Sequence, residues 1–380
     1  MIGADSRALH GPRPADLLVP VGALVLFAVM VGLVLASAGK TLGYDYTCYE
    51  GAARHLVNGQ PIYDNVFSIH VGTCPGTYTY PPPFAVALIP WLVFGDAAAA
   101  LWCMAMAACF LAGVALLPVR RDVRWLVLVV AALDWPLLYA VKLGQVEPIL
   151  FLGFAAAWRW MDRPSAVGAA AAGGALIKVQ PGLLAVWAIA TRRYRAAAVA
   201  VVSAVALAAA ATLVTGISAW ATYADLVSGL SGTFTTPHNF APGAIAHQAG
   251  ASDVVASAVQ LGSVALAVAA LLTAWRLASP EASLQVTILV SQLLSSPLRD
   301  HYAVLLLLPT AWLVARGRSW ALVFPLAGWI SLFADEGSGS WVAAASIPLA
   351  FFACLAVVLV EGLRERPPGH DQAPAVAAHS

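Results

Sequence analysis

Charged residues are scarce in this sequence. Asp, Glu, Lys and Arg make up only 10% of the 380 residues, whereas about a quarter of the residues in a soluble domain are charged. Hydrophobic residues make up 61%, and the mean hydropathy is +0.81. This composition excludes a soluble enzyme, an intrinsically disordered protein and a nucleic-acid binder. The sequence therefore predicts an all-α, polytopic integral membrane protein whose surroundings are membrane lipid.

Cysteine is also rare, with five residues in the chain. Cys103, Cys109 and Cys354 lie in apolar runs, where we interpret them as small packing residues. Cys48 and Cys74 share a polar segment, and we expect them to form a disulfide there, since an oxidising compartment permits one. The five cysteines do not resemble a zinc ligand set, and neither a metal nor another cofactor is expected.

Apolar runs fill most of the chain, and a membrane-crossing helix needs about 20 such residues. The runs lie at 17–38, 81–94, 97–117, 125–141, 147–161, 165–191, 196–216, 253–275, 282–297, 301–315, 319–334 and 341–360. The first is long for a signal peptide and lacks a convincing cleavage site. We interpret the short run at 81–94 as a partial or re-entrant helix. The run at 165–191 is interrupted at 178–181, which predicts two half-helices.

The arginines predict the orientation, because short cytoplasmic loops are enriched in Lys and Arg. Fifteen of the 20 basic residues form clusters at 7–13, 120–124, 159–163, 192–195, 276, 316–318 and 364–366. All clusters are cytoplasmic if the two unusual runs do not cross, which leaves about ten crossings in a plasma (inner) membrane and both termini inside. Twelve plain crossings are the alternative. Residues 1–366 then form a single membrane domain, and 367–380 a disordered cytoplasmic tail.

Two polar loops, 39–80 and 217–252, lie on the external face in this topology. In the first, Tyr46, Tyr49 and Ala53 recur at helical spacing, and 58–61 ends the predicted helix. Its tyrosines suit either the membrane interface or packing on the transmembrane bundle. Asp45 then lies at the mouth of the bundle, with a solvated surface carboxylate as the alternative.

Ionisable residues at membrane depth are candidates for function, because they are costly in a bilayer. The candidates are Asp134, Glu147, Lys178, Arg299, Asp300 and His301. Arg299 could bind a phosphate or carboxylate, and His301 could relay a proton near neutral pH. The alternatives are a local ion pair between Arg299 and Asp300 and an interfacial position for His301. Asp134, beside Trp135-Pro136, is predicted to hydrogen-bond a kinked helix.

Several short segments between residues 40 and 310 occur in a telling order. They are Asp45 with Tyr49, Leu56–Tyr63, Tyr80–Phe84, Gly144–Val146, Ala175–Pro181, and Ser296-Pro297 with His301-Tyr302. Taken together they resemble the GT-C class of integral-membrane glycosyltransferases, specifically glycosyltransferase family 87. The sequence departs from that family at Glu147, where an amide residue is expected. It departs again at 298–300, where the family more often has a Trp and paired histidines.

The resemblance implies a GT-C fold and a hexosyltransferase that uses a polyprenyl-phosphate sugar, usually mannose, as its donor. The acceptor would be a glycan or glycolipid outside the cytoplasm. The resemblance also implies that Asp45 is the catalytic base, and we expect His301 to assist it. Lys178, Arg299 and Gln145 are expected to bind the donor phosphate. The residues expected to line the acceptor cavity are Tyr44, Tyr49, Tyr80, Glu147 and His238.

The chemistry of the reaction agrees with these assignments. A single base that activates an acceptor hydroxyl would give inversion at the anomeric carbon. Asp45-Tyr46-Thr47 lacks the second acid of a DxD pair, so nothing visible requires a metal. A transporter or lipid flippase remains an alternative because of the broken helix at 178–181, and so does an inactive scaffold. An inverted repeat would favour transport, whereas an external cavity lined by Asp45 and His301 would favour transfer.

Overall fold

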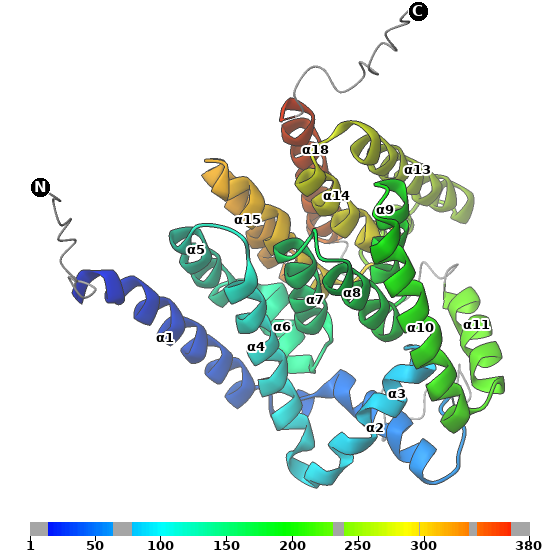
Figure 1. Cartoon of the computed structure of the whole chain (residues 1–380). Helices are drawn as coiled ribbons and strands as arrows, with labels where there is room; N and C mark the ends of the chain where they lie inside the picture. Colours follow the sequence, from blue (N-terminus) through cyan, green and yellow to red (C-terminus); the bar gives the residue numbers. More distant parts are fainter. Residues whose placement is uncertain (1–13, 64–77, 231–238, 296, 334–339, 366–380) are drawn as a thin grey trace, which may run out of the picture.

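The computed structural model describes residues 14–63, 78–230, 239–295, 297–333 and 340–365. Throughout these ranges the regular secondary structure is helical, with no strand, so the predicted all-α class is confirmed. The helices form a bundle that α1 enters obliquely from one side (Figure 1). His238, Cys74 and the tail 367–380 lie outside the described residues.

The helices follow one another along the chain with short connections. The first half contains α1 (Pro14–Ser37), η1 (Gly39–Thr41), α2 (Tyr44–Val57), α3 (Pro82–Leu88), η2 (Ile89–Ala97), α4 (Ala98–Leu116), α5 (Arg121–Ala132), α6 (Trp135–Leu143), α7 (Glu147–Arg159), α8 (Pro164–Ile177), η3 (Gln180–Gly182) and α9 (Leu183–Ala190). The second half contains α10 (Tyr194–Thr215), α11 (Ser218–Leu230), α12 (Pro242–Gln248), α13 (Asp253–Leu277), α14 (Pro280–Leu293), η4 (Asp300–Leu306), α15 (Leu307–Ala315), η5 (Ser319–Leu322), α16 (Val323–Leu326), η6 (Ala327–Phe333), α17 (Trp341–Ala344) and α18 (Ser346–Arg364).

Five helical stretches in the described ranges are long and apolar enough to cross a membrane. They are Leu18–Ser37, Pro82–Leu116, Tyr194–Thr215, Asp253–Leu277 and Trp341–Arg364. The bent pair α5 and α6 would make a sixth, and four further apolar helices are shorter. The chain is therefore a polytopic membrane protein, while the number of ten crossings stays a prediction.

Two of the predicted helix breaks are confirmed. The run at 165–191 separates into α8 and α9, and Lys178 lies between them in an extended conformation. The run at 125–141 bends by 67° between α5 and α6. At that bend the Asp134 Oδ2 accepts a hydrogen bond from the Leu137 backbone N–H at 3.1 Å. Asp134 is thus the N-cap of α6, which is the role in a kinked helix that the sequence predicted.

The helix in the first polar loop also forms as predicted, and it ends at Asn58. Tyr46 and Tyr49 are almost fully buried, and both rings pack on Trp102. Of the two interpretations, the structure favours packing on the bundle, because the tyrosine face contacts protein. The run at 81–94 forms α3 and part of η2, and Gly95 interrupts the helix before α4 with a φ of +50°.

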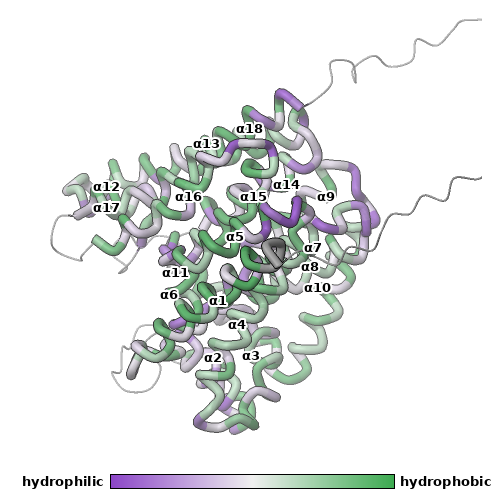
Figure 2. The backbone as a smooth tube through the Cα atoms, turned by 90° about the vertical axis from the view of Figure 1, so that its left-hand side faces the viewer, coloured by the Kyte–Doolittle hydropathy of each residue, from purple (hydrophilic) through white to green (hydrophobic). Residues whose placement is uncertain are grey.

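The basic clusters gather at one end of the bundle, which we call the arginine face. It is defined by the ion pairs Arg193–Asp162, Arg316–Glu281, Arg316–Glu365 and Arg318–Glu361. In Figure 1 the end of α18 lies at the top and α2 and α3 lie at the bottom. Figure 2 shows hydrophilic stretches near α9 and the end of α18, while the long helices are largely hydrophobic. The site described below lies toward the α2 end.

The centre of the bundle is formed by α14, η4 and α15, whose residues are almost all buried. The outer helix α18 packs on α14 through a close approach at Gly362. A Cβ atom built there would lie 2.2 Å from the Cβ of Ala282. The Gly362 carbonyl also accepts a hydrogen bond from the Ser279 backbone N–H at 3.0 Å, so the contact cannot open freely.

We predict that Gly362→Ala destabilises the protein by about 1–3 kcal/mol, the usual cost of overpacking a close contact. Gly153→Ala in α7 is the matched control, because a Cβ there meets no atom within 4 Å. The control should be neutral or stabilising, since Ala favours helix more than Gly. Thermal unfolding in detergent measures both, and equal melting temperatures for the two variants would contradict the close contact.

Candidate active site

Two glycines bring α2 against the turn between α6 and α7. Gly43, with a φ of +65°, donates its backbone N–H to the Lys142 carbonyl at 2.8 Å. Gly144, with a φ of +73°, accepts a hydrogen bond from the Trp102 indole at 2.7 Å. A Cβ on Gly144 would lie 2.9 Å from the Trp102 ring. Only glycine suits this left-handed turn, and the turn places Gln145 beside α2.

Gln145 joins Asp45 to a pair of buried tyrosines. Its Nε2 donates to the Asp45 Oδ2 at 2.6 Å, and its Oε1 accepts hydrogen bonds from Tyr49 at 3.2 Å and Tyr80 at 2.9 Å. The two hydroxyls are themselves 2.7 Å apart. Since phenols donate to the amide oxygen, the amide nitrogen must face the carboxylate. The tyrosines therefore fix which end of Gln145 holds Asp45.

Asp45 is half-buried in the first turn of α2. Burial raises its pKa above the ordinary value, and this effect exceeds the opposite effects of the His301 charge and the Gln145 hydrogen bond. Glu147 raises the pKa further, whereas Lys178 lowers it. A carboxylate with a raised pKa is a stronger base than an exposed one.

A second group of charges lies next to this network. Lys178 forms a buried ion pair with the Glu147 Oε1. The His301 Nε2 is 3.7 Å from the same oxygen, and its Nδ1 is 3.3 Å from the Asp300 Oδ1. In the described part of the chain, the buried Glu147 Oε2 has no hydrogen-bond partner. One carboxylate oxygen is thus committed to cations and the other could accept a hydrogen bond.

Two aromatic rings connect the networks. The Lys178 Nζ lies 4.2 Å from the centre of the Tyr302 ring and 5.6 Å from that of Tyr80. Both distances are within the range of cation–π attraction. Tyr80 also bonds Gln145, so Lys178 and Asp45 are linked through one phenol. The residues named so far form one connected site.

Most of the residues predicted for the site come together here. They are Asp45, Tyr49, Tyr80, Gln145, Glu147, Lys178 and His301. Gln145 contacts the carboxylate of Asp45, not a cation, which points to a role different from the predicted one in phosphate binding. Tyr44 begins α2 with an exposed ring. His238 lies outside the described residues, and so does Cys74. Cys48 is disulfide-bonded and Cys103, Cys109 and Cys354 are free, while the pairing with Cys74 stays a prediction.

Two residues near the site were not singled out by the sequence. The Tyr139 phenol on α6 interacts electrostatically with Asp300, Asp45 and Arg299. The buried Asn239 Oδ1 accepts hydrogen bonds from the backbone N–H groups of Ala241 and Leu298, which ties the segment after 238 to the chain before Arg299. No sequence pattern marks either residue, because each acts through contacts between distant segments. Among the described residues, no group of three His, Cys, Asp or Glu side chains could hold a metal ion.

We predict that Lys178→Met destabilises the protein by about 3–5 kcal/mol, because it leaves the buried Glu147 carboxylate without its cation. The double variant Lys178→Met/Glu147→Leu should recover most of this loss. Arg54→Met is the control, since it breaks an exposed pair with Glu50 and should cost less than about 1 kcal/mol. Thermal unfolding in detergent distinguishes these cases. Equal stabilities of Lys178→Met and Arg54→Met would contradict a buried pair.

Comparison with known proteins gives one match. The family model described as Glycosyltransferase family 87 matches residues 78–297, more than half of the chain. This range contains Tyr80, Gln145, Glu147 and Lys178, while Asp45 and His301 lie outside it. No protein of curated function and no solved structure matches the chain.

Proposed function

The chain belongs to glycosyltransferase family 87, and from this premise we propose that it transfers a sugar, with mannose expected, from a polyprenyl-phosphate donor to a glycan or glycolipid acceptor. The family makes it a membrane glycosyltransferase. The donor, the sugar, the acceptor and the external face of the plasma membrane as the site of transfer belong to the proposal.

The observation that carries the proposal is the Asp45 carboxylate held by Gln145. It is half-buried at the beginning of α2, so an acceptor can reach it. Its orientation is fixed by a hydrogen-bond network that includes Tyr49 and Tyr80. A base must be positioned within hydrogen-bond reach of the proton that it removes, and a rigid network meets this requirement better than a mobile side chain.

In the proposed reaction, Asp45 takes the proton of an acceptor hydroxyl as the hydroxyl oxygen attacks the anomeric carbon. The bond between that carbon and the phosphate oxygen breaks, and its electron pair leaves with the lipid phosphate. The products are the glycosylated acceptor, the polyprenyl phosphate and a protonated Asp45, which loses its proton to water. Attack from the face opposite to the leaving group inverts the configuration.

The other charged residues have complementary roles in this proposal. Arg299 begins η4 next to Asp300 and His301, where a guanidinium could bind the departing phosphate. Lys178 is committed to Glu147, so we assign it to holding the site together and not to direct phosphate binding. The unpartnered Glu147 Oε2 could accept a hydrogen bond from a sugar hydroxyl. His301 lies beside Glu147 and could relay the proton.

The transporter and flippase alternative has no observation in its favour among the described residues. The broken helix at Lys178, which suggested it, is part of the glycosyltransferase site through Glu147 and Tyr80. A substrate path through the bundle would require these charges to separate. The family match and the geometry around Asp45 both favour transfer.

We predict that Asp45→Asn lowers the transfer rate by roughly 10²–10⁴-fold, the usual contribution of a general base. The amide preserves the size of the side chain, so donor binding should persist. Asp96→Asn is the control, because Asp96 is an exposed residue of η2, and it should transfer at the wild-type rate. Membranes are incubated with radiolabelled polyprenyl-phosphate mannose and with other lipid-phosphate sugars. Wild-type transfer by Asp45→Asn would rule out this mechanism.

The pH dependence gives a second test. Because burial raises the pKa of Asp45, the acid limb of the kcat/KM profile should lie above pH 4, where an exposed carboxylate titrates. Activity is lost as the pH falls through that limb, since the base becomes protonated. Gln145→Leu removes a hydrogen bond that favours the carboxylate, so the limb should move up by about one pH unit. A limb that stays in place would show that Gln145 does not act through Asp45.

A further inference from the structure

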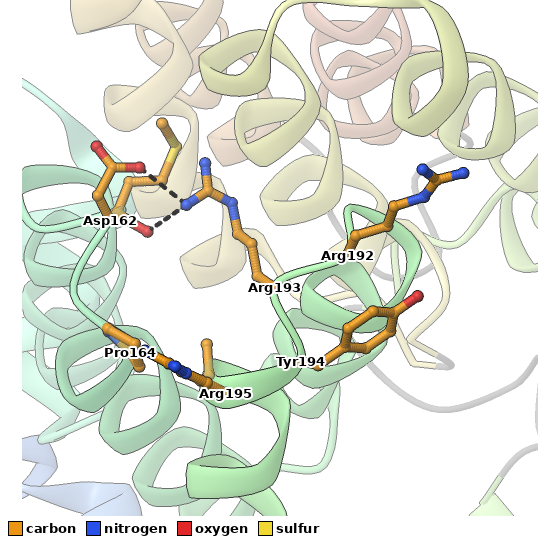
Figure 3. A pocket seen from close by; sticks show the side chains of 8 residues that line it. Asp162, Pro164, Arg192, Arg193, Tyr194 and Arg195 are labelled. Carbon is orange, nitrogen blue, oxygen red and sulfur yellow. Dashed lines mark hydrogen bonds and ion pairs between the residues drawn. The ribbon is translucent and has the colours of Figure 1, made fainter. Parts of the chain in front are cut away.

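The arginine face contains a pocket far along the bundle from Asp45. It has a volume of about 450 Å³ and lies between the α7–α8 and α9–α10 turns. Figure 3 shows the side chains around it. The lining residues are Met161, Asp162, Pro164, Arg192, Arg193, Tyr194, Arg195 and Ala196. Three consecutive basic or aromatic positions therefore surround one cavity.

The three arginines are not equivalent. Arg193 donates to the Met161 carbonyl at 2.8 Å and to the Asp162 carboxylate at 2.9 Å, and its guanidinium lies 5.2 Å from the centre of the buried Trp187 ring. It joins the two turns and neutralises the acid of the pocket. Arg192 and Arg195 are exposed, and within the described residues neither has an acidic partner. In Figure 3, Arg193 points toward Asp162, whereas Arg192 points away from it.

The backbone holds Arg192 in place. Its φ is +60°, which makes it unique among the described residues other than glycine. The turn is fixed by hydrogen bonds from the Arg192 N–H to Ile189 and from the Arg193 N–H to Ala188. A non-glycine residue in this conformation is uncommon and requires support from its surroundings. The two unpaired guanidiniums are thus presented by a structured turn.

Directly after the pocket, α10 turns an apolar surface outward. Its 22 residues extend about 33 Å at 1.5 Å each, close to the thickness of a bilayer core. Val201, Val202 and Val205 are more than half exposed, which suits contact with acyl chains. A basic pocket and a lipid-facing helix surface are therefore continuous.

We propose that this pocket binds the phosphate headgroup of an anionic phospholipid, with the acyl chains lying along α10. Arg192 and Arg195 bind the phosphate oxygens, which guanidinium groups suit in charge and geometry. Arg193 keeps the pocket open and screens Asp162. Basic pockets between membrane helices bind anionic headgroups in this way. A free phosphate shares the chemistry of the headgroup but would gain nothing from the apolar surface of α10.

The test is a titration of the detergent-purified full chain with phosphatidylglycerol, followed by native mass spectrometry. Phosphatidylcholine, glycerol 3-phosphate and inorganic phosphate form the other arms. Arg192→Gln/Arg195→Gln should weaken phosphatidylglycerol binding by roughly 30-fold, at about fivefold for each arginine. Arg120→Gln/Arg121→Gln is the matched control, since it removes two basic residues of another arginine cluster. It should change binding less than threefold, by roughly the scatter expected for surface charges.

A charge-preserving variant, Arg192→Lys/Arg195→Lys, should retain most of the binding, and its thermal unfolding checks that the turn still folds. Equal losses in the two Gln variants would overturn the proposal, since they would indicate general attraction to the arginine face. Equal binding of phosphatidylcholine would overturn it too. Displacement of the lipid by millimolar inorganic phosphate or glycerol 3-phosphate would show a site for free anions and would overturn the lipid assignment.

Discussion

The ion pair between Glu147 and Lys178 is the interaction on which the rest of the site depends. A bilayer offers no water to polar groups, so charges inside the protein must find partners there. Glu147 begins α7 and Lys178 follows α8, so the pair lies where two helices are interrupted. Each interruption exposes backbone and side-chain polar groups that a continuous helix would not. The pair makes both breaks tolerable and brings their ends together.

Tyrosines extend this constraint from the ion pair to Asp45. Tyr80 lies against Lys178 and also bonds Gln145, and Tyr49 bonds the same amide. Each contact restricts the next, so the position of the carboxylate depends on groups that never touch it. Chains of hydrogen bonds of this kind are worth more than their separate members. The site is therefore better described as one network than as a base with accessory residues.

The sequence predicts the chemical elements of this network but not its connections. Hydrophobic runs locate the helices, and the interruptions at Asp134 and Lys178 are visible because polar residues break apolar periodicity. The partnership of Gln145 with Asp45 is not visible, since 100 residues separate them and only the left-handed turns at Gly43 and Gly144 bring them together. Tyr139 and Asn239 carry no local signal at all. Burial of the Tyr46 face was likewise ambiguous, because a tyrosine stripe suits both lipid and protein surfaces.

Glu147 shows how one substitution can alter a whole site. The resemblance implies an amide at this position, which would carry no charge. The acid here attracts Lys178 and His301 and, through its charge, raises the pKa of Asp45. Lys178 and His301 act on Asp45 in the opposite direction, so the three side chains balance one another around the carboxylate. An acid without Lys178 would be unstable in the core, and Lys178 without the acid would lack its counter-charge. The departure at Glu147 is therefore a coupled feature of the site, and the basicity of Asp45 depends on both partners.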